Sequence, residues 1–133
     1  MGNKWIDSRN ALIENNLVQI SDFVTVKCAD TGVQKYIATL PKGAVILEYL
    51  IETVATFNSG ANDYFTLGFL ADDDAYINDL DISAGTAIYR GTVNVRLTAD
   101  TAVYATYTDG NASATTGEMR CAVMWAPWTA LVA

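Results

Sequence analysis

The sequence contains no histidine, and it has only two cysteines and two prolines among its 133 residues. Without histidine, the Ser-His-Asp and Cys-His triads in their usual form are excluded, and so is a histidine-based zinc site. An all-cysteine zinc site needs four thiolates, which two cysteines cannot supply. With 51% hydrophobic residues and nine glycines, the chain is also not of the disordered or low-complexity kind. We therefore expect a folded protein of one domain that is not an enzyme and holds no metal or cofactor.

The charge balance is acidic, with 15 Asp and Glu against 8 Lys and Arg and a net charge of −7. Binding nucleic acid through its phosphates needs clustered basic residues, so we expect no direct contact with nucleic acid. No apolar run approaches the ~20 residues that span a bilayer, and the first residues lack the apolar core of a signal peptide. Ile6 also stands where the N-myristoylation pattern requires Ser or Thr. These features predict no membrane association and a product made in a cytoplasm.

The longest alternation of apolar and polar residues lies between the turn Pro41-Lys42-Gly43 and the turn Asn58-Ser59-Gly60. Side chains of a strand alternate between its two faces, so this stretch predicts a central strand whose buried face carries Val45, Leu47, Tyr49, Ile51 and Phe57. Glu48 and Glu52 fall on the other face, about 13 Å apart by the rise of a strand. That separation is too large for the carboxylate pair of a glycosidase. We expect both side chains to be solvated or to face a partner.

Further strands are predicted over residues 18–29, 33–40, 64–70, 87–97, 103–107 and 118–125, separated by turn residues. In the strand over 87–97, Tyr89 and Val93 are expected to face inward, and Arg90 and Asn94 outward. Residues 71–81 predict an acidic loop with one short strand or turn inside it. Short connections and no convincing amphipathic helix predict an all-β fold, an antiparallel β-sandwich or jelly roll of about eight strands. This domain would comprise residues 17–133, preceded by an N-terminal arm over residues 1–16.

Both cysteines fall on apolar faces of predicted strands, Cys28 after Val24 and Val26, and Cys121 between Met119 and Val123. In a reducing compartment we expect two buried, reduced thiols. A disulfide between them stays open, because it requires the two strands to be neighbours.

The run Asp72-Asp73-Asp74, with Asn78, Asp79 and Asp81 nearby, is the one plausible ion site. Calcium takes six to eight oxygen ligands, and this loop offers several of them. The run lacks the spacing of an EF-hand and has no glycine at the position of the sharp turn. We therefore expect a solvated acidic loop rather than a calcium site.

Both ends of the chain carry apolar residues that have few local partners. The segment from Trp125 to Ala133 has no charged side chain, and large exposed apolar surfaces usually mark interfaces. We expect it to pack on its own domain or on another subunit, and the arm to do the same. The predicted interface residues are Trp5, Ile6, Leu12, Ile13, Trp125, Pro127, Trp128 and Leu131. The seven tyrosines are expected in the core or in cross-strand pairs, although an exposed row of them would suit a carbohydrate-binding module.

Several turn and strand signals between Leu40 and Trp125 occur together in one known family. They are Pro41-Lys42-Gly43, Phe57-Asn58-Ser59-Gly60, Thr66-Leu67-Gly68 with the acidic loop after it, Leu97-Thr98-Ala99-Asp100 and Thr116-Gly117-Glu118. With them, this stretch resembles the small virion proteins of tailed phages known as head decoration or cement proteins. The family has no catalytic residues to carry over to this chain.

The resemblance implies a β-sandwich on the outer surface of a phage capsid, often as a homotrimer, that bridges subunits of the major capsid protein. It also implies that the protein resides in the virion after assembly in the host cytoplasm. Two other functions stay open at this point. One is a component of the phage tail, neck or fibre base, and the other is a carbohydrate-binding β-sandwich module.

Overall fold

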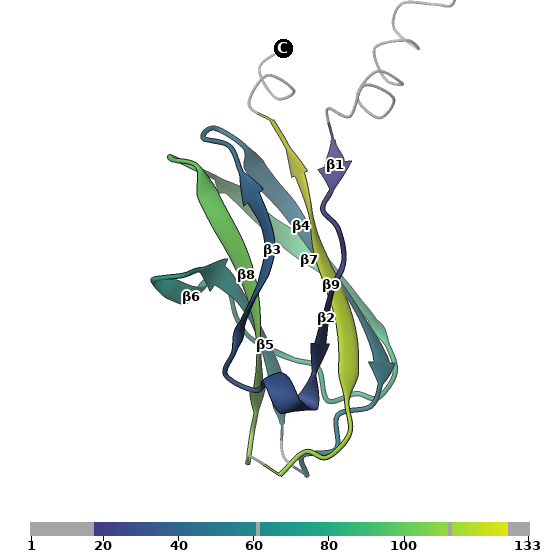
Figure 1. Ribbon diagram of the computed structural model, residues 1–133. Helices are drawn as coiled ribbons and strands as arrows, with labels where there is room; N and C mark the ends of the chain where they lie inside the picture. Colours follow the sequence, from purple (N-terminus) through teal and green to yellow (C-terminus); the bar gives the residue numbers. More distant parts are fainter. Residues whose placement is uncertain (1–17, 61, 112, 128–133) are drawn as a thin grey trace, which may run out of the picture.

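The computed structural model describes residues 18–60, 62–111 and 113–127, which form a sandwich of two antiparallel sheets (Figure 1). The predicted all-β fold is therefore confirmed. Its strands are β1 (Gln19–Ile20), β2 (Val24–Lys27), β3 (Gln34–Leu40), β4 (Val45–Ala55), β5 (Asp63–Phe69), β6 (Asp72–Asp81), β7 (Ile88–Arg96), β8 (Thr101–Asp109) and β9 (Glu118–Ala126). The arm predicted over residues 1–16 lies outside the described residues.

Most successive strands of the chain lie in different sheets, as in a jelly roll. The first sheet, sheet A, has the order β1-β9-β4-β7, with β2 also paired to β9. The second, sheet B, has the order β3-β8-β5-β6. From β2 onward, the chain passes from one sheet to the other at every connection except the β5–β6 hairpin. Long-range pairing of this kind cannot be read from the local pattern of the sequence.

The core lies between the inner faces of the two sheets. Tyr89 and Val93 of β7 pack against it while Arg90 and Asn94 are exposed, which confirms the faces predicted for this strand. Other inward positions follow the predicted alternation in β9, where the apolar residues are spaced by two. The largest fully buried side chains include Tyr107, Phe65, Leu40, Ile46, Ile51, Leu67, Ile82 and Met119.

The inward face of β4 differs from the prediction because the strand contains a bulge. Its register with both neighbours shifts between Ile46 and Glu48. Before the bulge, Ile46 is in the core at 0% exposure, while Leu47 is half-buried and is not one of the core residues. After the bulge, Tyr49 and Ile51 face the core, as predicted. An extra residue in one strand reverses the alternation on one side of it, so a strict two-residue period cannot hold along this strand.

Residues 72–81 form the ten-residue strand β6, so the prediction of an acidic loop was wrong. The strand pairs with β5 through two register shifts, and its half-buried Ile77 and Leu80 are three residues apart. Because of this irregular pairing, the apolar residues of β6 do not show the two-residue period by which a strand is recognised in a sequence. β6 is an edge strand, where exposed charges are favourable because they discourage pairing with other chains.

Cys28 lies in a 3₁₀ turn (Cys28–Asp30) rather than in the predicted strand, and it is half-buried. The turn forms where the N–H of Lys27 donates to Asp30 Oδ2 at 2.9 Å, and Lys35 Nζ lies 3.3 Å from the other carboxylate oxygen. Cys121 is fully buried in β9, and both cysteines are free thiols. The expected burial therefore holds for Cys121 and only in part for Cys28.

Turns far apart in the sequence are bonded to each other at both ends of the sandwich. At one end, the N–H of Gly43 donates to the carbonyl of Leu97 and the N–H of Lys42 to Asp100 Oδ1, each at 2.8 Å. At the other end, the side-chain Oδ1 of Asn58 accepts the N–H groups of Thr115 at 2.8 Å and Thr116 at 2.9 Å. Four of the five segments that carried the family resemblance thus take part in fixing these turns, and the fifth, Thr66-Leu67-Gly68, lies within β5.

Candidate interaction surfaces

The outward side of sheet A carries a set of exposed apolar side chains that we call outer face A. Phe23 is 53% exposed, Ile88 is 77% exposed, and the half-buried Leu50 lies with both around a shallow depression of about 260 Å³. Arg120 also lines this depression, and its guanidinium lies 5.9 Å from the centre of the Phe23 ring. The apolar members of outer face A are Ile20, Phe23, Leu50, Val54 and Ile88.

Two ion pairs border outer face A. Arg90 contacts Glu48 with two nitrogens, at 2.6 and 3.1 Å, and Arg120 contacts Glu52 at 2.5 Å. The hydrogen bond from Arg90 lowers the pKa of Glu48, so this carboxylate is ionised at neutral pH. The sequence predicted solvated or partner-facing glutamates but not their arginine partners, because that pairing depends on the register of β4 with β7 and β9. The charges on outer face A are thus largely neutralised within the chain.

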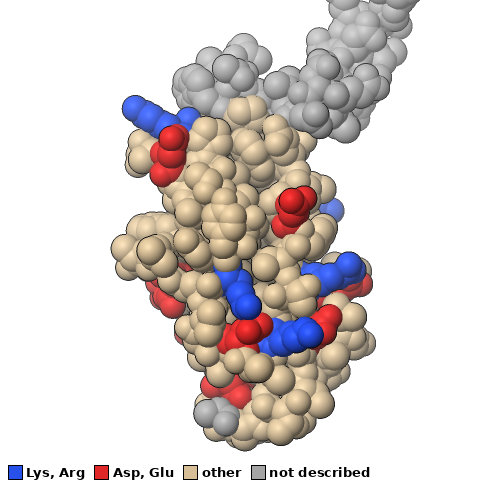
Figure 2. All heavy atoms as spheres, in the orientation of Figure 1, with Lys and Arg blue, Asp and Glu red and all other residues tan. Residues whose placement is uncertain are grey.

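Charged residues do not form a patch of one sign on the face of the molecule shown in Figure 2. Blue and red side chains lie mostly beside one another there, and most of the face is uncharged. This distribution gives no basic surface for phosphate contacts on the face in view.

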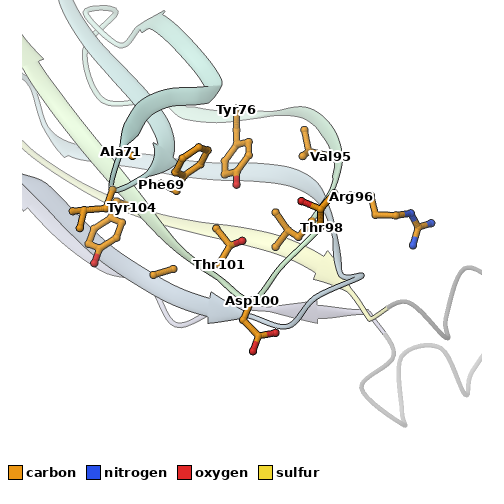
Figure 3. Close-up of a pocket in the computed structure, with 12 residues that line it drawn as sticks. Phe69, Ala71, Tyr76, Val95, Arg96, Thr98, Asp100, Thr101 and Tyr104 are labelled. Atoms are coloured by element: carbon orange, nitrogen blue, oxygen red, sulfur yellow. The ribbon is translucent and has the colours of Figure 1, made fainter.

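A second hollow, which we call the end cavity, lies beside the tip of the β5–β6 hairpin (Figure 3). Its volume is about 560 Å³, within the range of ligand pockets. Phe69 and Tyr76 come from the hairpin, Val95 and Leu97 from the end of β7 and the residue after it, and Tyr104 from β8. The charged side chains at its rim, Arg96 and Asp100, point away from it. Its wall is therefore mainly apolar and aromatic.

The carboxylates of Asp72, Asp73 and Asp74 lie within 4.8 Å of one another at the start of β6, and all three residues are exposed. A hydrogen bond with Asp72 raises the pKa of Asp74. Exposed acidic groups of this kind are common without a bound ion, and the cluster includes neither Asp79 nor Asp81. The geometry fits solvated side chains on a protected edge strand.

The groups with the most strongly shifted pKa values are sealed in the interior. Burial raises the pKa of the Cys121 thiol to about 12. Burial, together with the hydrogen bond to Asp63, also raises the pKa of Tyr107 far above its usual value. The Tyr107 hydroxyl donates to Asp63 Oδ1 at 2.5 Å, and both side chains are almost wholly inaccessible. These groups stabilise the interior and are not placed to meet a substrate.

The predicted interface residues are only partly within the described residues. Trp125 is half-buried and packs against the core, and Pro127 is half-buried just after β9. The other six, Trp5, Ile6, Leu12, Ile13, Trp128 and Leu131, lie outside the described residues. The sequence did not single out the apolar members of outer face A. A usable signal was present in β4, where Leu50 and Val54 are apolar on the face opposite Tyr49 and Ile51.

All seven tyrosines are described, and only Tyr36 has an exposed side chain, at 52%. It packs edge to face against Tyr104 with ring centres 5.8 Å apart, as a cross-strand partner would. The described tyrosines thus form no exposed row of rings. Among the described residues, no helix is long and apolar enough to cross a membrane.

Among solved structures, this chain is similar in fold to chains of two phage capsids. It matches a chain of the capsid asymmetric unit of cyanophage Pam1 with a TM-score of 0.64 and 18% identity, over 83% of this chain and 84% of that one. It matches a chain of the acidic stable capsid of Helicobacter pylori bacteriophage KHP30 with a TM-score of 0.67 and 15% identity, over 85% and 90%. No family model and no curated protein matches the sequence. At these identities, the similarity shows a shared fold between chains of comparable size.

Proposed function

We propose that this protein is a structural protein of a phage virion, a decoration or cement protein that binds the outer surface of the capsid. The observation that carries the proposal is the similarity to chains of two phage capsids, which extends over most of each chain. The matched chains are of comparable size, which suits a subunit that acts as one self-contained sandwich. The turn signals shared with head decoration proteins support the same function.

The proposed partner is the major capsid protein, and the proposed contact is outer face A. Burying apolar area contributes about 25 cal/mol per Å², so even a modest contact contributes stability when it repeats over a whole lattice. Leu50, Val54 and Ile88 lie in strands of sheet A, so their backbone loses little conformational freedom on binding. Internal ion pairs at the border avoid leaving unpaired charges in the interface.

Co-sedimentation with expanded capsids of the phage that encodes the protein tests this function. We expect the protein to sediment with capsids at a fixed stoichiometry, and Ile88→Asp to lose at least tenfold in affinity because it places a charge in an apolar contact. The matched control is Val33→Asp, which adds the same charge at a 49% exposed valine outside outer face A. Failure of the unmodified protein to bind capsids would contradict the capsid function. Equal binding by both variants would contradict outer face A as the contact.

The arm is proposed as an additional contact with the capsid, through Trp5, Ile6, Leu12 and Ile13, and the tail as a contact with another subunit, through Trp128 and Leu131. A homotrimer is the proposed assembly. Protein that lacks residues 1–16 is expected to occupy fewer capsid sites. Full occupancy by the shortened protein would contradict a role for the arm. Electron microscopy of virions distinguishes a place on the head from one in the tail, neck or fibre base.

A further inference from the structure

Strand β8 extends beyond the strand that pairs with one of its edges. On one side, β3 pairs with β8 as far as Thr101, opposite Leu40. On the other side, the pairing with β5 ends at Tyr104, opposite Gly68, because the chain turns there into the β5–β6 hairpin. Residues 101–103 of β8 therefore have one edge that no strand among the described residues pairs with. Sheet B lacks a short length of strand at this place.

The end cavity lies along this free edge (Figure 3). Thr101 and Ala102 of β8 form one wall, Phe69 and Leu70 of the hairpin close one end, and Val95 of sheet A forms part of the floor. Leu70 is 67% exposed at the rim and adds apolar surface to it. The site thus offers a strand edge beside an apolar hollow. That combination suits an extended segment with apolar side chains and no charged side chain.

We propose that residues 128–133 of a second copy of this chain bind in the end cavity as an added strand along residues 101–103 of β8. The segment Trp128-Thr129-Ala130-Leu131-Val132-Ala133 has no charged side chain, and its Trp, Thr and Val favour strands. In an extended chain, alternate side chains point to one face, so apolar side chains enter the hollow in either register. Backbone hydrogen bonds to the free edge of β8 provide the rest of the contact.

The position of Ala126 at the end of β9 explains why the occupant comes from another molecule. Val45 pairs with both Ala126 and Arg96, so β9 ends level with the end of β7 and two strands away, about 10 Å at the usual spacing. The free edge of β8 lies in the other sheet, and the bonds from Lys42 to Asp100 and from Gly43 to Leu97 join two turns across this end of the sandwich. Six extended residues span about 20 Å. A chain crossing this end to its own β8 would leave too few of them to form the added strand.

A contact of this kind joins two different surfaces, so it repeats head to tail and closes into a ring when the rotation permits. It therefore supplies a contact for the homotrimer proposed above, and it rests on that self-association but not on binding to a capsid. Co-sedimentation tests the capsid function, whereas the experiments below use the isolated full-length protein. A failure of one is thus distinguishable from a failure of the other.

Disulfide formation between singly substituted chains tests the contact directly. In a Cys28→Ser background, chains with Ala102→Cys are mixed with chains with Ala130→Cys and oxidised. We expect a disulfide-linked dimer of the two variants. The matched control replaces Ala102→Cys by Ala84→Cys, an exposed alanine at the opposite end of the sandwich, and gives no such dimer. Absence of the mixed dimer, or an internal disulfide within a chain that carries both substitutions, overturns the proposal.

Sedimentation equilibrium of full-length variants gives an independent measurement. Leu131→Asp is expected to weaken self-association at least tenfold, because it adds a charge to the segment that enters the apolar hollow. Ala84→Asp carries the same change in charge and is expected to associate like the unmodified protein. Unchanged association of Leu131→Asp, or a monomeric unmodified protein at roughly 100 μM, well above the micromolar affinity of a specific contact, overturns the proposal.

Discussion

The two ends of the sandwich differ in how tightly their side chains are packed. At the end near Asn58, the closed end, Phe57 packs on Tyr107 with ring centres 4.3 Å apart, and Tyr107 donates to the buried Asp63. A side chain on Gly117 would begin 2.2 Å from the Phe57 ring, so glycine is required there. At the other end, the open end, the end cavity of about 560 Å³ lies between the two sheets. Side chains fill one end and leave the other hollow.

This difference does not come from the loops, because turns at both ends are fixed by hydrogen bonds between distant segments. It comes from the length of β5, which stops at Phe69 while β8 extends three residues beyond its last partner. A sandwich can therefore have well-fixed turns and still have an unfilled place between its sheets. The closed end contributes stability, and the open end offers a surface to a partner.

The largest expected effect comes from truncating the same side chain at each end. Phe57→Ala is expected to lower the free energy of unfolding by about 3–5 kcal/mol, because it empties a buried site against Tyr107. Phe69→Ala at the half-buried wall of the end cavity is expected to cost about 1–2 kcal/mol, since less area leaves contact with protein. Urea unfolding of both variants measures the difference. Equal losses would show that the two ends are packed alike.

The dependence of stability on alkaline pH tests whether the interior around Cys121, between the two ends, is inaccessible to water. The folded pKa of Cys121 is raised to about 12 from an ordinary value of 9.0, so its stabilisation is present below about pH 9 and is lost as the pH rises toward 12. By pH 11, this thiol alone is expected to cost about 2–3 kcal/mol relative to neutral pH. Cys121→Ala removes that contribution, so its stability is expected to fall less steeply. Parallel curves for the two proteins would mean that water reaches the thiol.

A smaller effect is expected from the buried hydrogen bond at the closed end. Tyr107→Phe leaves the Asp63 carboxylate without this donor and is expected to cost about 1–3 kcal/mol at neutral pH. Tyr36→Phe removes an exposed hydroxyl contact to Thr39 and is expected to change stability by less than about 0.5 kcal/mol. Thermal or urea unfolding separates the two. If both variants were equally stable, water would have to replace the lost donor at Asp63.

The smallest effect is expected on outer face A. Glu48→Gln breaks the ion pair between the partly exposed Glu48 side chain and the exposed Arg90 side chain. Because a surface ion pair contributes little, the unfolding midpoint is expected to stay unchanged in both low and high salt. Glu48→Gln is expected to have a larger effect on capsid binding, because loss of the Glu48 carboxylate leaves the Arg90 charge unpaired in the proposed interface. A clear loss of stability would mean that outer face A serves the fold more than a partner.

Particular elements show how far the sequence predicts this fold. In β7 and β9, the two-residue period predicted the inward residues correctly, as Tyr89, Val93, Cys121 and Val123 show. In β4 a bulge moved Ile46 into the core, and in β6 irregular pairing concealed a strand of ten residues. Local pattern encodes which side chains avoid water, whereas bulges arise from pairing with strands that are distant in sequence. Both failures lie at such bulges.

The candidate surfaces were harder to predict than the core for the same reason. Apolar residues at even positions of β4 mark a strand with two apolar faces, but they do not tell which neighbour covers them. Ion pairs such as Glu52 with Arg120 join residues 68 positions apart, and only register brings them together. The predicted interface residues of the arm and tail stay predictions.

By itself, the sequence determined an all-β chain without histidine chemistry, with alternating strands and turn residues that fix the loops at both ends. Composition and short-range spacing suffice for this, because they set which side chains are buried and where the backbone turns. Tertiary structure alone decided the order of strands in the two sheets, the bulges and the cross-strand ion pairs. It also decided the free edge of β8 beside the end cavity, since that edge exists only because β5 ends before its neighbour does.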